Sequence, residues 1–360
     1  MVNFTNMIKN DYKVIGVMSG TSLDGIDLVY VHFKFEDNWK FDLICCETIY
    51  YNDYWVEKLG GLINYSKETL LKTDETYTAF LAGTIKTFID KYNIKTINAV
   101  CSHGHTALHI PERGLTYQIG NTPQLAKLLG KKIVCDFRVQ DVALGGQGAP
   151  LVPIGDRLLF AEYDFCLNLG GFANISTENN SKRIAYDICP VNIVLNKYVG
   201  KLGFPFDDGG KIAATGSINP NLLKALNTIA FYAKKPPKSL GLEWVETTVF
   251  SLIESFNLMV KDILRTFVEH IAYQLALEIN KKSKASVLVT GGGVYNTFLM
   301  QRLTHYTQNT IVVPNSDIVE FKEALIFGFL GVLKLENQNN CLKSVTGASK
   351  NHSSGKIFLP

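Results

Sequence analysis

The sequence has no dense block of basic residues and no long uncharged hydrophobic run. Its 36 Lys and Arg residues exceed its 33 Asp and Glu residues by 3, too small an excess to favour binding to nucleic-acid phosphates. The longest uncharged apolar stretch, Ala324–Leu333, is far shorter than the roughly 20 residues that a membrane-spanning helix needs. Segment 1–13 also lacks the apolar core and cleavage site of a signal peptide. We therefore expect a cytoplasmic protein that binds neither nucleic acid nor membrane.

Cysteine pairs with the spacing of metal or redox sites are missing too. The seven cysteines are odd in number, include no Cys-x-x-Cys pair and mostly lie inside apolar segments, which indicates reduced core thiols rather than disulfides. Hydrophobic residues make up 46% of the chain and charged residues 19%, a composition that excludes a largely disordered protein. The cysteines are Cys45, Cys46, Cys101, Cys135, Cys166, Cys189 and Cys341.

Predicted strands and helices alternate along the chain, whose 360 residues favour two domains. Lys13–Phe33 is predicted as a strand, a tight turn and a strand, and Asp164–Ser176 has the same pattern. The alternation predicts an α/β fold, and the similar openings suggest two related domains with a soft boundary near residue 160. The other predicted elements are helices over 69–92 and 122–129, strands over 97–102, 132–135 and 286–290, and a long helical region over 249–280.

The turn between the first two predicted strands has the composition of a phosphate-binding loop. Its small residues offer unobstructed backbone N–H groups and two hydroxyls, which suit phosphate oxygens, and Asp24 is placed to hold a Mg²⁺-bound water. An ordinary glycine hairpin turn is the alternative, since the loop lacks the lysine of a Walker A sequence. The residues assigned to nucleotide binding here are Gly20, Thr21, Ser22, Leu23, Asp24, Gly25, Ile26 and Asp27.

Two further glycine-rich turns follow predicted strands. Gly170 and Gly171 can close on the same phosphates, and the triplet Gly291, Gly292 and Gly293 lets an adenine or ribose lie against bare backbone. Three such turns, in the order phosphate, phosphate, adenosine, resemble the pattern of the actin, Hsp70 and hexokinase superfamily.

That resemblance implies two related actin-like, ribonuclease H-like domains with a nucleotide cleft between them. The domains would be residues 1–160 and 161–360, and packing of the last helix back on the first domain is left open.

A closer resemblance, spread over nearly the whole chain, is to the anhydro-N-acetylmuramic acid kinase family. Together the motifs are highly specific, although each glycine turn is a weak signal alone. The motifs are, in order, Gly16–Asp27, Ser102–Thr106, Gln118–Asn121, Asp136–Arg138, Gly145–Leu151, Asn168–Asn174, Pro236–Ser239, Gly291–Gly293 and Lys322–Ala324.

The family resemblance implies a reaction of peptidoglycan recycling, in which ATP, Mg²⁺ and water convert 1,6-anhydro-N-acetylmuramic acid to N-acetylmuramic acid 6-phosphate. A carboxylate must take a proton from the water that attacks the anomeric carbon, while the freed O6 attacks the γ-phosphate. The family's base opens an Asp-Thr-Gly-Pro-Gly-Asn motif that matches Asp187–Asn192, so Asp187 is the candidate base. Cys189 and Val191 replace the two glycines and Ile188 the threonine, which adds bulk near the reacting centre and leaves substrate geometry and rate open.

Further site residues are implied by the same resemblance. Arg138 can pair with the muramic-acid carboxylate, and Lys238 can approach nucleotide phosphate; the alternatives are a surface arginine and a solvated loop lysine. Glu323 has a functional role in the family, although a carboxylate there also favours a helix N-terminus. The substrate-binding candidates are His105, Arg138, Asp141, Asn192 and Glu323.

His103, His105 and His109 have spacings found in zinc sites, which would need further Cys, His or carboxylate ligands nearby. The family motif has glutamine or a related polar residue where His105 stands. We therefore predict a substrate contact for His105 and no metal-ligating residues.

Two other functions stay open from the sequence. One is a simple hexosamine or small-metabolite kinase of the same superfamily, in which Asp187 deprotonates a substrate hydroxyl instead of water. The other is a nucleotide-gated sugar sensor that lost catalysis with the altered loop. The partner expected in each case is a small amino sugar, and a homodimer is an open alternative to a monomer.

Overall fold

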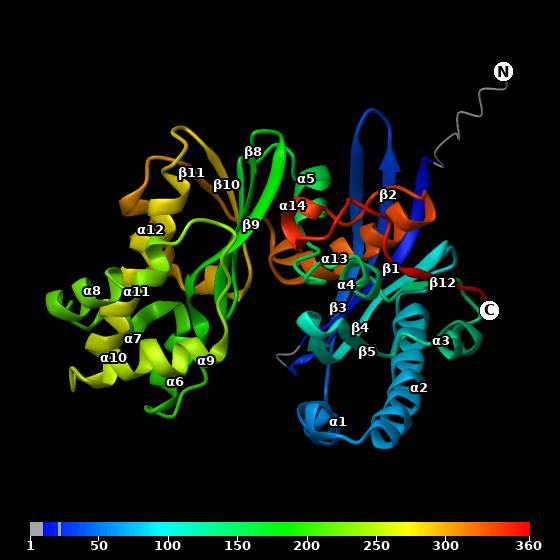
Figure 1. The fold of residues 1–360 in the computed structure, drawn as a ribbon, viewed down its shortest axis with the longest axis horizontal. Coiled ribbons are helices and arrows are strands. Elements are labelled where there is room, and N and C mark those ends of the chain that lie inside the picture. Colours follow the sequence, from blue (N-terminus) through cyan, green and yellow to red (C-terminus); the bar gives the residue numbers. More distant parts are fainter. Residues whose placement is uncertain (1–9, 21–22) are drawn as a thin grey trace. The chain divides into compact units, whose positions relative to one another are not determined.

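The computed structural model describes residues 10–20 and 23–360, which form two compact units (Figure 1). Unit 1 contains the described residues up to Leu159 together with Phe321–Pro360, and unit 2 is Phe160–Glu320. The second change of unit falls inside helix α13 (Ser316–Leu335). Residues 321–360 therefore group with unit 1. The sequence assigned them to the domain 161–360 and left open that the last helix packs back on the first domain.

Unit 1 is built on a mixed sheet. Its strands are β1 (Asp11–Ser19), β2 (Gly25–Phe35), β3 (Trp39–Tyr50), β4 (Ala99–Ile110), β5 (Leu115–Ile119), β6 (Ile133–Cys135) and β12 (Lys356–Phe358). The strand order is β12-β6-β4-β1-β2-β3, and β5 pairs with β4. Strands β1, β2 and β3 pair antiparallel, whereas β4 is parallel to both β1 and β6.

Helices of unit 1 pack their apolar stripes on this sheet. In α2, the residues Tyr77, Leu81, Ile85 and Phe88 recur at helical spacing and are fully or almost fully buried, and burial of each such side chain contributes roughly 1.5–3 kcal/mol. Ser66 caps this helix by accepting a hydrogen bond from the Thr69 N–H. The helices are α1 (Asp53–Gly60), η1 (Leu62–Asn64), α2 (Lys67–Lys91), η2 (Pro111–Arg113), α3 (Pro123–Leu129), α4 (Val139–Ala143), α5 (Pro153–Leu159), the second part of α13, and α14 (Lys343–Thr346).

Helix α13 approaches the unit 1 sheet at glycines. A Cβ at Gly16 would overlap the Ala324 carbonyl oxygen, and a Cβ at Gly331 would overlap the sulfur of Cys101. A Cβ at Gly328 would lie 3.5 Å from the Gly16 Cα. The helix backbone therefore packs almost directly on β1 and β4. Larger residues at these positions would prevent so close an approach.

Unit 2 repeats the strand arrangement of unit 1. Its sheet has the order β11-β10-β7-β8-β9, with antiparallel pairing of β7, β8 and β9 and parallel pairing of β10 with β7 and β11. The order and orientations equal those of β6-β4-β1-β2-β3. The prediction of an α/β fold with related halves is confirmed. The strands are β7 (Phe165–Leu169), β8 (Phe172–Asn179), β9 (Lys182–Pro190), β10 (Ser286–Thr290) and β11 (Thr310–Val312).

The long helical region predicted over 249–280 consists of separate helices. Helix α10 ends at Glu254, Asn257 has a left-handed φ of 47°, and α11 begins at Val260. Asparagine tolerates this conformation better than most residues, which ends the first helix. The helices of unit 2 are α6 (Asn192–Gly200), η3 (Asp208–Gly210), α7 (Lys211–Ala214), α8 (Pro220–Asn227), η4 (Ala230–Ala233), α9 (Leu242–Trp244), η5 (Val245–Phe250), α10 (Ser251–Glu254), α11 (Val260–Ile279), η6 (Gly292–Tyr295) and α12 (Thr297–Tyr306).

Within the described parts of the chain, no helix combines the length and the apolar character that crossing a membrane requires.

The packing of α13 on β1 can be tested at Gly16. We expect Gly16→Ala to lower the free energy of unfolding by about 1–3 kcal/mol, because the new methyl group must push the helix backbone away. Urea unfolding followed by tryptophan fluorescence measures the change, since Trp39 and Trp55 are buried in unit 1. Gly83→Ala is the matched control: Gly83 is exposed within α2 with open space around it, so alanine there should stabilise by about 0.5–1 kcal/mol. Equal stability of the two variants would contradict the packing argument.

Candidate functional site

The predicted phosphate loop connects β1 to β2 in unit 1. Thr21 and Ser22 lie outside the described residues. The Leu23 N–H donates to the Gly20 carbonyl oxygen over 3.4 Å, and Leu23 has a left-handed φ of 62°. Asp24 is exposed. Gly20 and Leu23 thus lie close together next to the carboxyl end of β1, and contact of the predicted loop with a nucleotide stays a prediction.

The residues that follow the loop serve the hairpin as well. A Cβ at Gly25 would lie 2.5 Å from the Ile49 carbonyl oxygen, so the close pairing of β2 with β3 requires glycine there. Ile26 is fully buried in the core of unit 1. Asp27 is half-buried and accepts a 2.6 Å hydrogen bond from the Thr48 hydroxyl. Of these three predicted nucleotide-binding residues, Asp27 has the side chain best placed to reach a ligand.

A buried network of polar side chains lies at the carboxyl end of β1. The Ser19 Oγ is 2.6 Å from the Tyr51 hydroxyl and 2.8 Å from the His105 Nδ1, and the Tyr51 and Tyr77 hydroxyls are 2.8 Å apart. Burial lowers the pKa of His105 to about 4 and raises that of Tyr51 to about 12. His105 is therefore neutral at physiological pH, suited to hydrogen bonding rather than to charge pairing.

Arg138 is held in place by a second histidine of β4. Its Nε donates to the His103 Nε2 over 2.9 Å and its Nη1 donates to the Gly148 carbonyl oxygen over 2.6 Å. The His103 Nδ1 is 2.8 Å from the Gly104 carbonyl oxygen. Because Nε2 must accept while Nδ1 donates, His103 is the neutral tautomer with its proton on Nδ1. Burial and the charge of Arg138 hold the pKa of His103 well below its usual range.

Glu323 lies near the guanidinium of Arg138. Its side chain is exposed to solvent, yet the surrounding protein atoms displace enough water to raise its pKa, and the charge of Arg138 opposes this rise. An acid and a fixed cation therefore stand close together in unit 1.

Asp141 organises the glycine-rich loop after α4. Its Oδ2 accepts the Gly148 N–H over 2.8 Å and its Oδ1 accepts the Thr346 hydroxyl over 2.7 Å. A Cβ at Gly146 would overlap Oδ2. Asp141 is fully buried, so a direct substrate contact, which stays a prediction, would require this loop to open. In the structure its carboxylate instead binds the Gly148 N–H and so fixes the loop whose Gly148 carbonyl oxygen accepts from Arg138.

In unit 2, the Gly170-Gly171 turn is joined to the start of α6. The Gly171 carbonyl oxygen accepts from the Val191 N–H over 2.8 Å, and the Gly170 carbonyl oxygen accepts from the Asn192 N–H over 3.3 Å. The turn and the first residues of α6 therefore form one rigid corner. Asn192, a predicted substrate-binding residue, is half-buried at this corner.

The triplet Gly291–Gly293 lies beside that corner, because β7 and β10 are parallel neighbours whose carboxyl ends meet at one edge of the sheet. A Cβ at Gly291 would lie 2.8 Å from the Leu169 carbonyl oxygen, and one at Gly293 would lie 2.7 Å from the Leu169 Cβ. No described atom lies within 4 Å of a Cβ built on Gly292, which is exposed. Two of the glycines thus permit packing, and Gly292 presents bare backbone at the edge where α/β sheets bind ligands.

Asp187 stands on β9 at a β-bulge. The register shifts there, because Asn174 of β8 pairs with Asp187 while Ala173 pairs with Cys189. The Leu240 N–H donates to the Asp187 Oδ2 over 2.8 Å, and the Asp187 N–H donates to the Lys238 carbonyl oxygen over 3.1 Å. Partial burial raises the pKa of Asp187, and the hydrogen bond from Leu240 opposes the rise. Its carboxylate is thus oriented through one oxygen and has increased basicity.

The side chain of Lys238, predicted to approach nucleotide phosphate, lies against other protein groups in the structure. Its side chain is buried, with its Nζ 3.9 Å from the Glu278 Oε1 and 5.0 Å from the centre of the Phe231 ring. Burial lowers the pKa of Lys238, and the Glu278 charge raises it. Contact with nucleotide phosphate stays a prediction, and it is the Lys238 carbonyl group that touches the Asp187 backbone.

Sequence reasoning missed several residues of these networks. Ser19 lies at the carboxyl end of a predicted strand, a position where ligand-binding side chains gather, so the sequence does carry a signal for this residue. Tyr51 and Tyr77 have no local sequence signal, because their contacts are distant in sequence. Tyr51 lies 32 residues after Ser19, and Tyr77 lies 26 residues after Tyr51. The spacing of His103 suggests a metal ligand, whereas in the structure its side chain accepts a hydrogen bond from Arg138.

Comparisons with known sequences agree over nearly the whole chain. A model of the family described as anhydro-N-acetylmuramic acid kinase matches residues 12–360. The protein of that name from Pseudomonas fluorescens is 34% identical, with 96% of this chain and 98% of the relative covered. The one from Mannheimia succiniciproducens is 35% identical, with 98% and 100% covered.

Solved structures are similar only at a distance. The activator of 2-hydroxyisocaproyl-CoA dehydratase from Clostridium difficile, with bound ADPNP, has a TM-score of 0.44 and 14% identity, with 90% of this chain and 96% of that chain covered. A ROK family glucokinase from Streptomyces griseus, in complex with glucose and AMPPNP, has a TM-score of 0.38 and 11% identity, with 90% and 98% covered.

The burial of neutral His105 predicts a pH dependence of stability. Below its ordinary pKa of 6.5 the unfolded chain binds a proton that the folded chain does not bind until about pH 4, so stability falls as pH drops through this window. His105→Gln keeps a polar partner for Ser19 and removes the titration. We expect its unfolding free energy to fall less steeply with acidification, by up to ~1.4 kcal/mol per pH unit. Urea titrations across this range measure the slope, and His305→Gln, at an exposed position, is the control. Identical slopes for both variants would contradict the assignment.

Proposed function

The chain belongs to the anhydro-N-acetylmuramic acid kinase family, and from that membership we propose that it converts 1,6-anhydro-N-acetylmuramic acid to N-acetylmuramic acid 6-phosphate with ATP and water. The observation that supports this most is the half-buried Asp187 carboxylate, anchored through one oxygen and raised in pKa. It stands at the position where the family resemblance implies the catalytic base.

In the proposed reaction, Asp187 takes a proton from a water molecule as that water attacks the anomeric carbon. The bond from the anomeric carbon to O6 breaks, and O6 then forms a bond to the γ-phosphorus of ATP as the bond to the β-phosphate oxygen breaks. The sugar gains a hydroxyl group and a phosphate, and ADP leaves. A carboxylate with a raised pKa is a better proton acceptor, which suits this role.

ATP and magnesium fit the glycine-rich turns that each unit presents at the carboxyl ends of its strands. In unit 2 the exposed Gly292 offers bare backbone next to the rigid Gly170-Gly171 corner. In unit 1 the loop ending at Asp24 and the carboxylate of Asp27 offer oxygen ligands of the kind that Mg²⁺ prefers. Bound Mg²⁺ would supply positive charge to the phosphate oxygens, and both assignments are part of the proposal.

Arg138 is proposed to pair with the lactyl carboxylate of the sugar. Its Nε and one N–H of Nη1 are occupied by His103 and Gly148. A bidentate pair with a carboxylate must therefore use Nη2 and the second N–H of Nη1. The fixed guanidinium would orient the substrate at little entropic cost, with His105, Asn192 and Glu323 as further polar contacts. A cytoplasmic location is the part of the proposal that depends on the sequence alone, and a homodimer stays open beside a monomer.

The reaction is tested with purified protein, ATP, Mg²⁺ and 1,6-anhydro-N-acetylmuramic acid in water labelled with ¹⁸O. We expect N-acetylmuramic acid 6-phosphate carrying one ¹⁸O at the anomeric carbon, measured by mass spectrometry before that oxygen exchanges with solvent. Asp187→Asn should lower kcat/KM by about 10²–10⁴-fold, while Asp42→Asn, at a side chain that is 69% exposed, should leave it unchanged.

Other outcomes of this assay would identify the competing functions. Phosphorylation of an ordinary hexosamine without label would indicate a simple sugar kinase. Nucleotide binding without turnover, unchanged in Asp187→Asn, would indicate a sugar sensor and contradict the proposed catalysis.

The raised pKa of Asp187 predicts the acidic limb of the pH–rate profile. The base acts only when ionised, so kcat/KM should fall on acidification with a midpoint above the ordinary aspartate value of 3.8. Steady-state rates at increasing acidity, with circular dichroism as a check of folding, give this midpoint. Residual activity of Asp187→Asn should lack the limb; a limb that survives in this variant would assign the base to another residue.

A further inference from the structure

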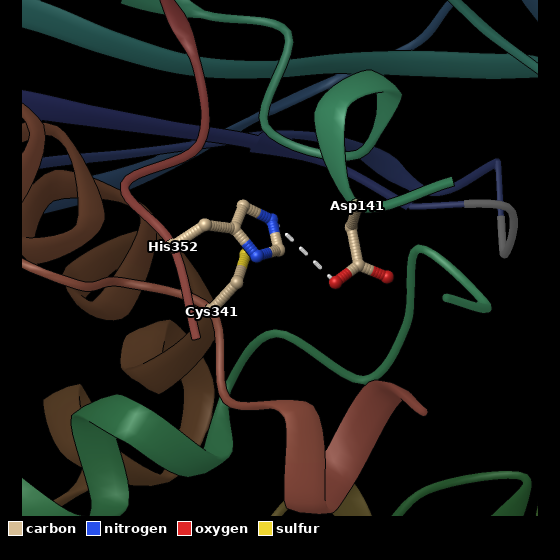
Figure 2. Close-up of side chains that lie close together, drawn as sticks. All are labelled: Asp141, Cys341 and His352. Atoms are coloured by element: carbon tan, nitrogen blue, oxygen red, sulfur yellow. Dashed lines mark ion pairs between the residues drawn. The ribbon is translucent and has the colours of Figure 1, made fainter. Parts of the chain in front are cut away.

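Three buried side chains with metal-ligand chemistry converge in unit 1. Asp141 comes from α4, whereas Cys341 and His352 come from the C-terminal segment, and Figure 2 shows the three side chains pointing toward one another. One ligand atom of each lies within 4.8 Å of the others. Their exposed fractions are 0%, 2% and 4%. The proposed catalytic chemistry uses none of these as a reacting group.

The backbone fixes two of the three residues next to each other. Cys341 and His352 form an antiparallel bridge, in which the Cys341 N–H donates to the His352 carbonyl oxygen over 3.1 Å and the His352 N–H donates back over 3.2 Å. The buried Asn340 ties this bridge to its surroundings, because its Nδ2 donates to the Leu330 and Ser354 carbonyl oxygens. The thiol and the imidazole are therefore held together by main-chain geometry.

The His352 imidazole has the polarity of a metal ligand. Its Nδ1 lies 3.1 Å from the Lys350 carbonyl oxygen, which places a proton on Nδ1, so that in the neutral imidazole Nε2 carries the lone pair. The buried Nε2 has no hydrogen-bond partner among the described residues, and it faces the Asp141 Oδ1 at 3.6 Å. A buried acceptor without a partner is costly. A histidine that donates one nitrogen to a backbone carbonyl and leaves the other bare has the arrangement usual in metal sites.

The Asp141 carboxylate can bind a metal ion and keep its hydrogen bonds to Gly148 and Thr346. Its two oxygens each take one hydrogen bond, from the Gly148 N–H and the Thr346 hydroxyl, and each oxygen keeps a further lone pair. This carboxylate is already fixed in direction, so a cation would meet a preformed ligand.

We propose that Asp141, Cys341 and His352 bind one divalent transition-metal ion, with Zn²⁺ as the best match to their oxygen, sulfur and nitrogen donors. The ion would displace the thiol proton of Cys341, so that carboxylate and thiolate together balance its charge. Ligand atoms of a tetrahedral zinc site stand about 3.5 Å apart. The side chains must therefore close by about 1 Å from their present separation, with a water molecule in the fourth position.

Such an ion would join the C-terminal segment to the loop that anchors Arg138. Asp141 holds the Gly148 N–H, and the Gly148 carbonyl oxygen accepts from Arg138. A metal bridge from Cys341 and His352 to Asp141 would thus stiffen the support of that arginine. The binding itself does not depend on the proposed kinase reaction.

The experiment uses the full-length protein, stripped of metal with a chelator and then titrated with Co²⁺ as a spectroscopic probe. We expect one Co²⁺ per chain, a thiolate-to-cobalt charge-transfer band, loss of that band when Zn²⁺ is added, and a higher thermal unfolding midpoint with Zn²⁺. Cys341→Ser and His352→Gln should remove the charge-transfer band and weaken Zn²⁺ binding by more than the roughly 10–100-fold that loss of an outer partner costs. Cys45→Ser, at a half-buried thiol on β3, should leave binding unchanged.

Several results would overturn the proposal. They are the absence of a charge-transfer band in the wild-type protein, binding that persists in Cys341→Ser, or loss of binding in Cys45→Ser. If substitutions at Cys341 or His352 prevent folding, the wild-type titration still tests the proposal, since the absence of a thiolate-to-cobalt band would exclude any cysteine ligand.

Discussion

The contact of α13 with β1 and β4 is the constraint on which the arrangement of unit 1 depends. Gly16, Gly328 and Gly331 remove the side chains that would separate helix and sheet. The aromatic ring of Phe329 then packs on Phe33 and Trp39, with ring centres 5.3 Å apart in both pairs. With the helix axis fixed this closely, Glu323, which lies within α13 rather than at its start, is set beside Arg138, whose charge acts on the pKa of Glu323. Packing thus decides where these charged groups stand.

The two units use one topology for different purposes. Each has an antiparallel hairpin followed by parallel strands, with a glycine turn after its first strand. In unit 2 the carbonyl groups of that turn bind the start of α6, so the turn is a rigid corner beside Asp187. In unit 1 the buried hydroxyl and imidazole groups of Ser19 and His105 lie at the corresponding strand end. A shared backbone plan therefore carries neutral hydrogen-bonding groups in one unit and a basic carboxylate in the other.

Local patterns predicted the elements well, and long-range contacts explain what they missed. The strand, glycine turn and strand of each hairpin depend on neighbouring residues, so they could be read from the sequence. The break before α11 depends on a left-handed Asn257 in an otherwise apolar, helix-like region. Asp141 illustrates the same limit in the site, because its partner Thr346 is 205 residues away. No spacing rule relates such residues until the chain has folded.

The order in which the chain passes between units has a consequence for its synthesis. Unit 2 is continuous, whereas unit 1 is completed by Phe321–Pro360. On the ribosome, unit 2 can fold as soon as it emerges, but the first part of unit 1 must wait for α13, which contributes the fully buried Phe329 and Leu330. Until then the face of the sheet that α13 covers is exposed and prone to aggregation. During the synthesis of unit 2, this uncovered sheet face is therefore a surface to which chaperones that recognise apolar residues can bind.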